Sequence, residues 1–207
     1  MEQPIKHSNS PDYWLILLCQ SLVASFIRHV VLRFTNYTIR IDNVELDRNK
    51  IYVIAANHQH GDDPFVANAV APIAVRSKLL PIKFMTKNRF YFTWWRPAAF
   101  MMGCFPARQK DEGHERYGVA EAIRVGKLGY RIWIFPEGKV TKPGEERAHS
   151  GVSRILEGLP EAELILCHVK WINRRGNRRR LHVRFKLADE TIDRNNPQQI
   201  LDAIYSL

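Results

Sequence analysis

The chain has 207 residues, of which 45% are hydrophobic and 11% aromatic, and its formal charge at pH 7 is +10. This length and composition are typical of one globular domain with a sizeable core, and they exclude a disordered or low-complexity chain. The three cysteines are far apart and form neither a C-x-x-C pair nor a Cys/His zinc spacing. They exclude a disulfide scaffold and indicate buried thiols in a reducing compartment.

The N-terminal region is unusually apolar. Tyr13 to Ile27 is a stretch of fifteen residues without a charge, and Arg28, His29 and Arg33 follow it. A bilayer span needs about 20 apolar residues, so we predict a helix over residues 13–34 that lies in a membrane interface. A buried core helix is the alternative, and the flanking charges do not favour a cleaved signal peptide. We therefore divide the chain into a membrane-associating segment, 1–34, and a second domain, 35–207.

Strand-like and helix-like stretches alternate along the rest of the chain. Strands are predicted at residues 37–41, 51–56, 80–84, 130–135, 164–171 and 181–187. Helices are predicted at residues 65–75, 113–128 and 150–159 and from Pro197 onward, with N-caps at Asp63 and Asn196. The last two strands flank a turn at 175–177 and predict a hairpin. The alternation indicates an α/β fold: a mixed, largely parallel central sheet flanked by helices, with the interfacial helix at its N-terminus.

Positive charge is concentrated in two runs without acidic residues. Residues 76–96 contain six Lys and Arg, and residues 170–186 contain eight. Such runs favour a phosphate-bearing partner, which could be anionic lipid, an acidic carrier protein, a nucleotide or nucleic acid. A solvated surface is the alternative for each run.

The segment Asn57-His58 with Asp63 follows a buried strand and indicates acid–base chemistry. A neutral histidine can accept a proton near pH 7, and a carboxylate on one ring nitrogen leaves the other free to act as a base. We therefore expect His58 and Asp63 to form a catalytic pair that deprotonates an alcohol. A structural histidine and a simple N-cap are the alternatives for the two residues.

Other polar residues follow the ends of other predicted strands, where ligands collect in such sheets. Arg108 offers a planar fork that matches a phosphate, and Lys87 offers a point charge. Glu137 could bond substrate hydroxyls, while Gly138 allows a close backbone approach. Surface salt bridges are the alternative for the charged residues. Backbone N–H groups near Gly138 or at the helix that starts at Pro64 are candidate oxyanion donors.

Several common enzyme signatures are missing from the sequence. It has no G-x-S-x-G elbow, no G-x-x-x-x-G-K-[ST] loop and no G-x-G-x-x-G turn, which disfavours a covalent serine enzyme, a nucleotide hydrolase and a dinucleotide dehydrogenase. The proposed chemistry requires neither a metal nor a bound cofactor.

Taken together, these motifs resemble the glycerolipid acyltransferases typified by lysophosphatidic acid acyltransferase. The family pattern is N-H-x-x-x-x-D, then G-x-x-x-x-R, then F-P-E-G. This chain has Asn57-His58 with Asp63, Gly103 with Arg108, and Phe135 to Gly138. The resemblance implies that His58 and Asp63 are catalytic. It also implies that Asn57, Lys87, Arg108, Glu137 and Gly138 form the substrate-binding site for a glycerol phosphate.

The resemblance implies transfer of a fatty acyl chain from acyl-CoA or acyl-carrier protein to the free hydroxyl of a lysophospholipid, most simply 1-acylglycerol-3-phosphate, which gives phosphatidic acid. The expected location is the cytoplasmic face of a membrane, as a peripheral or monotopic protein. The third block continues with Lys139-Val140 instead of the usual Thr-Arg or Ser-Arg, which is similar to tafazzin-like transacylases that move acyl chains between phospholipids. A non-catalytic lipid- or nucleic-acid-binding module that uses residues 174–184 is the third hypothesis, although no nucleic-acid-binding motif accompanies this run.

Overall fold

The computed structural model describes residues 12–31, 33, 36–42, 45–60, 63–107, 117–141, 146–172 and 180–207. The described residues form one seven-stranded sheet in the order β1-β7-β6-β2-β5-β3-β4. The strands are β1 (Asn36–Asp42), β2 (Tyr52–Ala56), β3 (Ile82–Thr86), β4 (Cys104–Pro106), β5 (Arg131–Ile134), β6 (Glu163–Ile172) and β7 (Arg180–Leu187). The β6–β7 pair is antiparallel and the other neighbours are parallel. The predicted largely parallel sheet is confirmed, as is the pairing of its last two strands.

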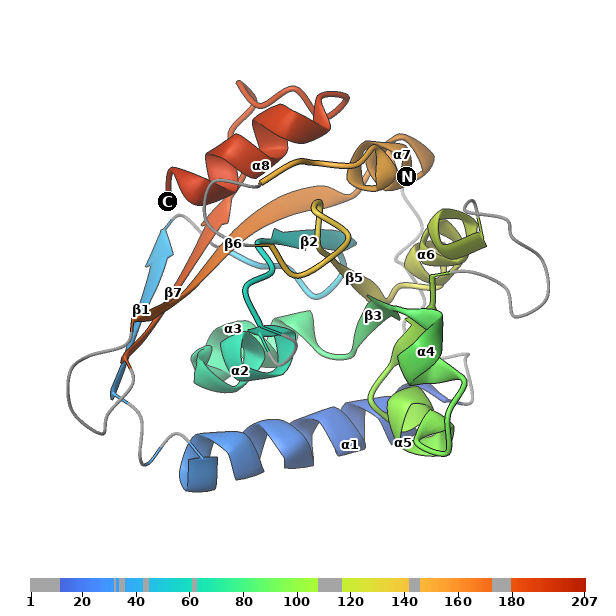
Figure 1. The fold of residues 1–207 in the computed structure, drawn as a ribbon, viewed down its shortest axis with the longest axis vertical. Helices are drawn as coiled ribbons and strands as arrows, with labels where there is room; N and C mark the ends of the chain where they lie inside the picture. Colours follow the sequence, from blue (N-terminus) through green and yellow to red (C-terminus); the bar gives the residue numbers. More distant parts are fainter. Residues whose placement is uncertain are drawn as a thin grey trace.

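Helices cover both faces of this sheet (Figure 1). They are α1 (Tyr13–Phe26) with the π-helical turn η1 (Ile27–Val31), α2 (Asp63–Val70), α3 (Ile73–Leu79), α4 (Asn88–Tyr91), α5 (Arg96–Met101), α6 (Tyr117–Lys127), α7 (Gly151–Gly158) and α8 (Pro197–Tyr205). Alternate residues of β2 belong to different hydrophobic clusters, because successive side chains of a strand point to opposite faces. Tyr52 and Ile54 pack with α2, whereas Val53 and Ala55 pack with α6, α7 and α8.

One predicted helix is two helices in the structure. The sequence pattern predicted a helix over residues 65–75, but α2 ends at Val70 and α3 begins at Ile73. Pro72 lies between them and has extended backbone angles. Proline has no N–H to donate and clashes with the preceding turn, so a continuous helix cannot pass through this position. The prediction of one helix here was wrong.

Helix α1 has one face against the protein and one apolar face exposed to solvent. Tyr13, Ile16, Gln20 and Ala24 are buried at helical spacing. The large exposed side chains on the other face are Trp14, Leu15, Leu18, Leu22 and Phe26. From Tyr13 to Val30 the helix is long and apolar enough to cross a membrane by length and composition, and only 22% of this stretch is buried in the protein. The helix therefore packs on the core and still presents an uncovered apolar surface.

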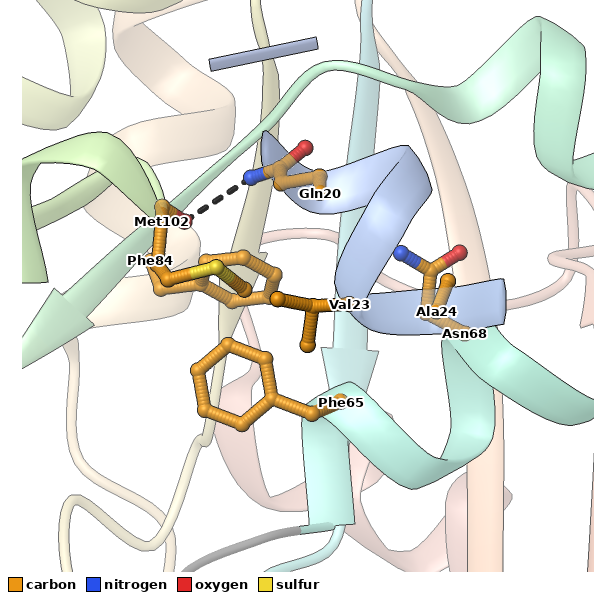
Figure 2. Close-up of a pocket in the computed structure, with 7 residues that line it drawn as sticks. All are labelled: Gln20, Val23, Ala24, Phe65, Asn68, Phe84 and Met102. Atoms are coloured by element: carbon orange, nitrogen blue, oxygen red, sulfur yellow. Dashed lines mark hydrogen bonds between the residues drawn. The ribbon is translucent and has the colours of Figure 1, made fainter. Parts of the chain in front are cut away.

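Gln20 fastens α1 to the sheet. Its side-chain amide donates to the carbonyls of Ile82 (2.6 Å) and Met102 (2.9 Å), and its oxygen accepts from the N–H of Ile82 (2.9 Å). Figure 2 shows this side chain reaching Met102 beside the apolar Val23 and Phe65. A polar residue inside the apolar stripe is thus satisfied by backbone groups of β3 and of the turn before β4.

Candidate active site

The residues predicted to act together follow the carboxyl ends of parallel strands. His58 lies two residues beyond β2, Lys87 directly follows β3, and Glu137 lies three residues beyond β5. Because these strands are parallel and lie close in the sheet, their ends meet at one edge. Lys87 is exposed there. Arg108 lies outside the described residues, and its predicted role in phosphate binding stays a prediction.

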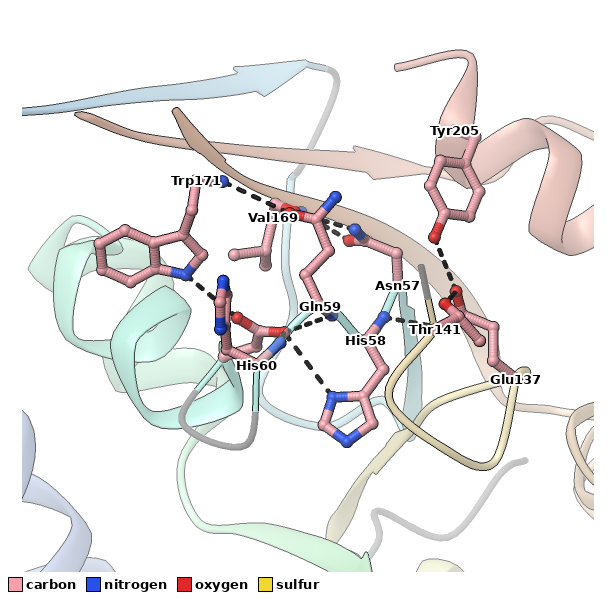
Figure 3. Close-up of polar contacts among 10 residues, drawn as sticks. Asn57, His58, Gln59, His60, Glu137, Thr141, Val169, Trp171 and Tyr205 are labelled. Carbon is pink, nitrogen blue, oxygen red and sulfur yellow. Dashed lines mark hydrogen bonds and ion pairs between the residues drawn. The ribbon is translucent and has the colours of Figure 1, made fainter. Parts of the chain in front are cut away.

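The ring of His58 faces the carboxylate of Asp63 (Figure 3). Nδ1 of His58 lies 3.6 Å from Oδ2 of Asp63, and the ring stacks on Phe135 with 3.9 Å between ring centroids. Nε2 points away from the carboxylate. The 3.6 Å separation is longer than a hydrogen bond, and Nδ1 is buried without a hydrogen-bond partner among the described residues. The nearby carboxylate favours a proton on Nδ1 by its charge, which leaves Nε2 as the basic nitrogen.

Asp63 is fully buried, and three donors hold its carboxylate. Oδ2 accepts from the backbone N–H groups of Gln59 (2.8 Å) and His60 (2.6 Å), and Oδ1 accepts from the indole N–H of Trp171 (3.2 Å). These hydrogen bonds satisfy both oxygens of the buried carboxyl group. The carboxylate bonds the loop before α2 instead of the first turn of that helix, so the hydrogen bonds described do not include the N-cap bond predicted for Asp63.

Glu137 is fully buried and supports the backbone of His58. Its Oε2 accepts from the N–H of His58 (2.7 Å), while Oε1 accepts from the hydroxyls of Thr141 and Tyr205 (both 2.7 Å). Burial, and then the bond to Glu137, raises the pKa of Tyr205. With both oxygens engaged inside the protein, Glu137 in this conformation positions the histidine loop, and its predicted contact with substrate stays a prediction.

Asn57 is also fully buried and joins two strands. Its amide donates to the carbonyl of Val169 (2.8 Å) and accepts from the N–H of the same residue (2.7 Å). The side chain thus continues the β2–β6 ladder past the end of β2 and fixes where the chain turns toward His58. Its predicted substrate contact remains a prediction as well.

Gly138 forms the turn after β5, with φ of +64°. A Cβ at this position would lie 3.2 Å from Cδ2 of His149, and L residues rarely adopt this backbone conformation. The N–H of Gly138 donates to the carbonyl of Phe135 at 2.9 Å. This N–H is therefore occupied by the turn, and the oxyanion donors expected near Gly138 or at the helix that starts at Pro64 stay a prediction.

Sequence reasoning missed the residues that hold Asp63 and Glu137 from a distance. Trp171 bonds Asp63 from 108 positions away, and Tyr205 bonds Glu137 from 68 positions away. No local motif marks either residue. The usable signal was that an indole N–H or a phenol hydroxyl needs a partner when it is buried. Among the described residues no cluster of three or more His, Cys, Asp or Glu could hold a metal ion.

The fold and the site define an acyl-transferring class of α/β protein. The model of the acyltransferase family matches residues 38–157, more than half of the chain, and the chain belongs to that family. A search of curated proteins finds no significant match. Among solved structures, the chain is similar to the 1-acyl-sn-glycerophosphate (LPA) acyltransferase PlsC from Thermotoga maritima, with a TM-score of 0.59, 11% identity and coverage of 96% of this chain and 82% of PlsC. The family resemblance of the motifs is thereby confirmed, and the likeness to PlsC shows a shared fold.

Proposed function

We propose that this acyltransferase moves a fatty acyl chain from acyl-CoA or acyl-carrier protein to the free hydroxyl of a lysophospholipid, with 1-acylglycerol-3-phosphate as the acceptor and phosphatidic acid as the product. The observation that carries the proposal is the His58–Asp63 pair, with Nδ1 facing a buried carboxylate and Nε2 facing away, at the carboxyl edge of the sheet. The similarity of fold to PlsC, an LPA acyltransferase, supports this substrate class.

In this mechanism, Nε2 of His58 takes the proton of the acceptor hydroxyl as the oxygen attacks the thioester carbonyl. A carbon–oxygen bond forms and the carbon–sulfur bond breaks. The thiolate leaves, and the proton held by His58 passes to it. Asp63 keeps Nδ1 protonated and stabilises the imidazolium. No acyl-enzyme is needed, because the acceptor oxygen itself is the nucleophile.

The acceptor phosphate needs cations at the same edge. Lys87 is exposed directly after β3, and we assign it to the phosphate together with Arg108. Asn57, Glu137 and Gly138 support this site in the proposal. Glu137 accepts the backbone N–H of His58, Asn57 bonds Val169 of β6 just before His58, and Gly138 closes the turn after β5 through its bond to Phe135.

The enzyme would work on a membrane surface, and we assign it to the cytoplasmic face as a peripheral or monotopic protein. The exposed apolar face of α1 supports this assignment. Trp94 and Trp95 add to it, because they stack at 3.9 Å between centroids and are both exposed just before α5, which packs beside α1. Tryptophan pairs of this kind favour the boundary between lipid and water.

Removal of the base tests the reaction. We expect His58→Ala and Asp63→Ala to lower acyl transfer from acyl-CoA to lysophosphatidic acid by at least about 100-fold, since general-base catalysis contributes that much. His60→Ala is the matched control, because His60 is an adjacent exposed histidine whose contact with Asp63 is through its backbone. Each variant is checked for its thermal midpoint. Full activity of a folded His58→Ala protein would refute the mechanism.

A phospholipid is the alternative acyl donor, and one specific observation supports it. Lys139-Val140 follows the Phe-Pro-Glu-Gly turn, as in tafazzin-like transacylases, and both residues are exposed. Incubation with a diacyl phospholipid and a labelled lysophospholipid, without any thioester, distinguishes a phospholipid acyl donor from a thioester donor. Label transfer that requires His58 would favour the transacylase, and transfer only with thioester would favour the main proposal. The basic module at 174–184 lies mostly outside the described residues.

A further inference from the structure

A groove of about 590 Å³ lies at the amino end of β5, and His58 lies beyond the carboxyl ends of the parallel strands. Its lining includes Trp14, Arg48, Ile73, Arg76, Ser77 and Arg131, from α1, the loop before β2, α3 and the start of β5. Arg131 is the first residue of β5, whereas the turn that holds His58 follows the last. The groove and the catalytic pair therefore lie at opposite ends of the same strand. Its volume is within the range of ligand sites.

Arg131 is an unusual residue at the base of this groove, because it is a buried cation without a counter-charge among the described residues. It is 1% exposed, and its guanidinium donates to the carbonyls of Gly129 (3.3 Å) and Arg48 (2.6 Å). Its Nε is buried and has no hydrogen-bond partner among the described residues. Burial lowers the pKa of Arg131, an effect that the hydroxyl of Tyr13 opposes. A buried guanidinium is normally paired with an anion.

The cations around Arg131 lack a compensating acid. No carboxylate lines the groove within the described part of the chain. Burial lowers the pKa of Arg76, and the nearby charge of Arg28 lowers it further. The carboxylate of Asp12, which precedes α1, is bonded to Lys83 (2.9 Å) and Tyr130 (3.0 Å). An anion in the groove would relieve this uncompensated positive charge.

Apart from Ser21, Ser25 and Ser77, the rest of the lining is apolar or aromatic, and it joins the exposed face of α1. Trp14 is 64% exposed and Ile73 is 71% exposed. Along α1, Trp14 is followed by the exposed Leu18 and Leu22. A ligand that suits both parts carries an anionic group for the arginines and a hydrocarbon chain for this apolar strip, which is the chemistry of an anionic phospholipid.

We propose that this groove binds one anionic phospholipid of the bilayer, with its phosphate among Arg48, Arg76 and Arg131 and an acyl chain along Trp14 and Ile73. This lipid is neither the donor nor the acceptor of the reaction, because the site is at the edge of the sheet opposite to His58. It fixes the depth and the tilt of α1 on the membrane, and the proposal does not depend on which acyl group the enzyme transfers.

The test is binding of dihexanoyl phosphatidylglycerol, a soluble anionic phospholipid, at monomeric concentrations, measured by calorimetry. We expect one saturable site in the wild type and about tenfold weaker binding in the double variant Arg48→Gln/Arg76→Gln, since charge-assisted bonds are lost. Arg124→Gln/Arg154→Gln is the matched control, because it removes the same charge from exposed positions on α6 and α7. The control should bind like the wild type.

The outcomes separate a lipid site from general charge attraction. Equal weakening in both double variants would overturn the proposal in favour of diffuse electrostatics. Inorganic phosphate that binds the wild type as tightly as dihexanoyl phosphatidylglycerol does would overturn the lipid assignment in favour of a simple anion site. Acyl transfer measured in detergent micelles should stay at the wild-type rate in Arg48→Gln/Arg76→Gln, and its loss together with lipid binding would show that the two sites are not separate.

Discussion

Two buried carboxylates support His58 in different ways. Asp63 faces the imidazole ring, whereas Glu137 accepts the backbone N–H of the same residue. Each carboxylate is in turn held by an aromatic side chain from a distant element, Trp171 on β6 or Tyr205 at the end of α8. The orientation of the base therefore depends on contacts that span most of the chain.

The hydroxyl of Tyr205 is the simplest of these supports to remove. We expect Tyr205→Phe to lower kcat about fivefold with little change in KM, because the loss of a bond to buried Glu137 loosens the His58 loop without touching substrate. Steady-state kinetics measure the split. Tyr37→Phe on the exposed edge strand β1 is the control. A change in KM alone would contradict a positioning role.

His168 on β6 makes stability depend on pH. Burial, and then the charges of Lys170 and Arg184, lower the pKa of His168. In the unfolded chain the pKa of histidine is about 6.5. Between the folded-state pKa and pH 6.5 the unfolded state binds more protons than the folded state does. The stability that neutral His168 contributes is therefore complete above pH 6.5, and it is lost as the pH falls through the folded-state pKa.

We expect His168→Gln to flatten the fall in the free energy of unfolding between pH 7 and pH 5, measured by urea denaturation at each pH. The exposed His182 on β7 provides the control variant His182→Gln. An unchanged slope in His168→Gln would show that other groups cause the loss at low pH.

At the scale of single residues, the sequence indicated the chemistry of side chains better than it indicated their tertiary contacts. His58 and Asp63 are only five positions apart, so their pairing could be predicted from the sequence. Asn57 and Glu137 were assigned to substrate from the family motifs. Their internal partners, Val169 and Tyr205, are far away in the sequence and could not be recognised from it. A polar residue in a motif can bind a ligand or its own fold, and only the tertiary structure distinguishes the two.

At the scale of elements, α1 has two faces with opposite requirements. Gln20 bonds backbone groups inside the protein, and Leu22 is 62% exposed on the outer face. The interfacial and core interpretations of this helix were alternatives in sequence terms. The structure gives the helix a packed face and an apolar open one, because its residues are apolar nearly all round.

A reciprocal pair of substitutions tests this division. We expect Gln20→Leu to lower the free energy of unfolding by about 3 kcal/mol, since buried backbone groups of Ile82 lose their partners, and to leave vesicle binding unchanged. Leu22→Gln should change stability by less than about 0.5 kcal/mol and weaken binding to lipid vesicles. Urea denaturation and vesicle flotation measure the two effects. Weakened flotation in both variants or in neither would argue against separate faces.

The sequence predicted the strand β2 more accurately than the helix over residues 65–75. The strand β2 is a short apolar run buried on both sides, which sequence marks clearly. The helical periodicity of residues 65–75 was real, but the backbone restriction at Pro72 outweighed it. A steric effect at one residue can override a pattern that extends over ten.

At the scale of the whole molecule, one sheet separates two hydrophobic clusters that share its strands. Leu79 of α3 belongs to one cluster and Leu201 of α8 to the other, and both are buried. Because the central strands β2, β5 and β6 contribute side chains to both clusters, neither cluster can be lost while the other keeps its packing. We infer that the described parts of the chain unfold together.

Leu79→Ala and Leu201→Ala test this cooperativity on opposite faces. We expect each to lower the free energy of unfolding by about 3 kcal/mol through the cavity it creates, and to shift the whole transition without splitting it. Tryptophan fluorescence and far-ultraviolet circular dichroism should give coincident curves. Two separate transitions in either variant would show that the faces unfold independently.

The bond between Tyr205 and Glu137 also has a consequence for biosynthesis. A ribosome makes the apolar helix α1 early and the histidine loop soon after it, but the tyrosine that completes the support of that loop is added some 150 residues later. The nascent chain can therefore meet a membrane before the loop of His58 is held in place. The support of this loop is complete only after α8 has been made and has docked.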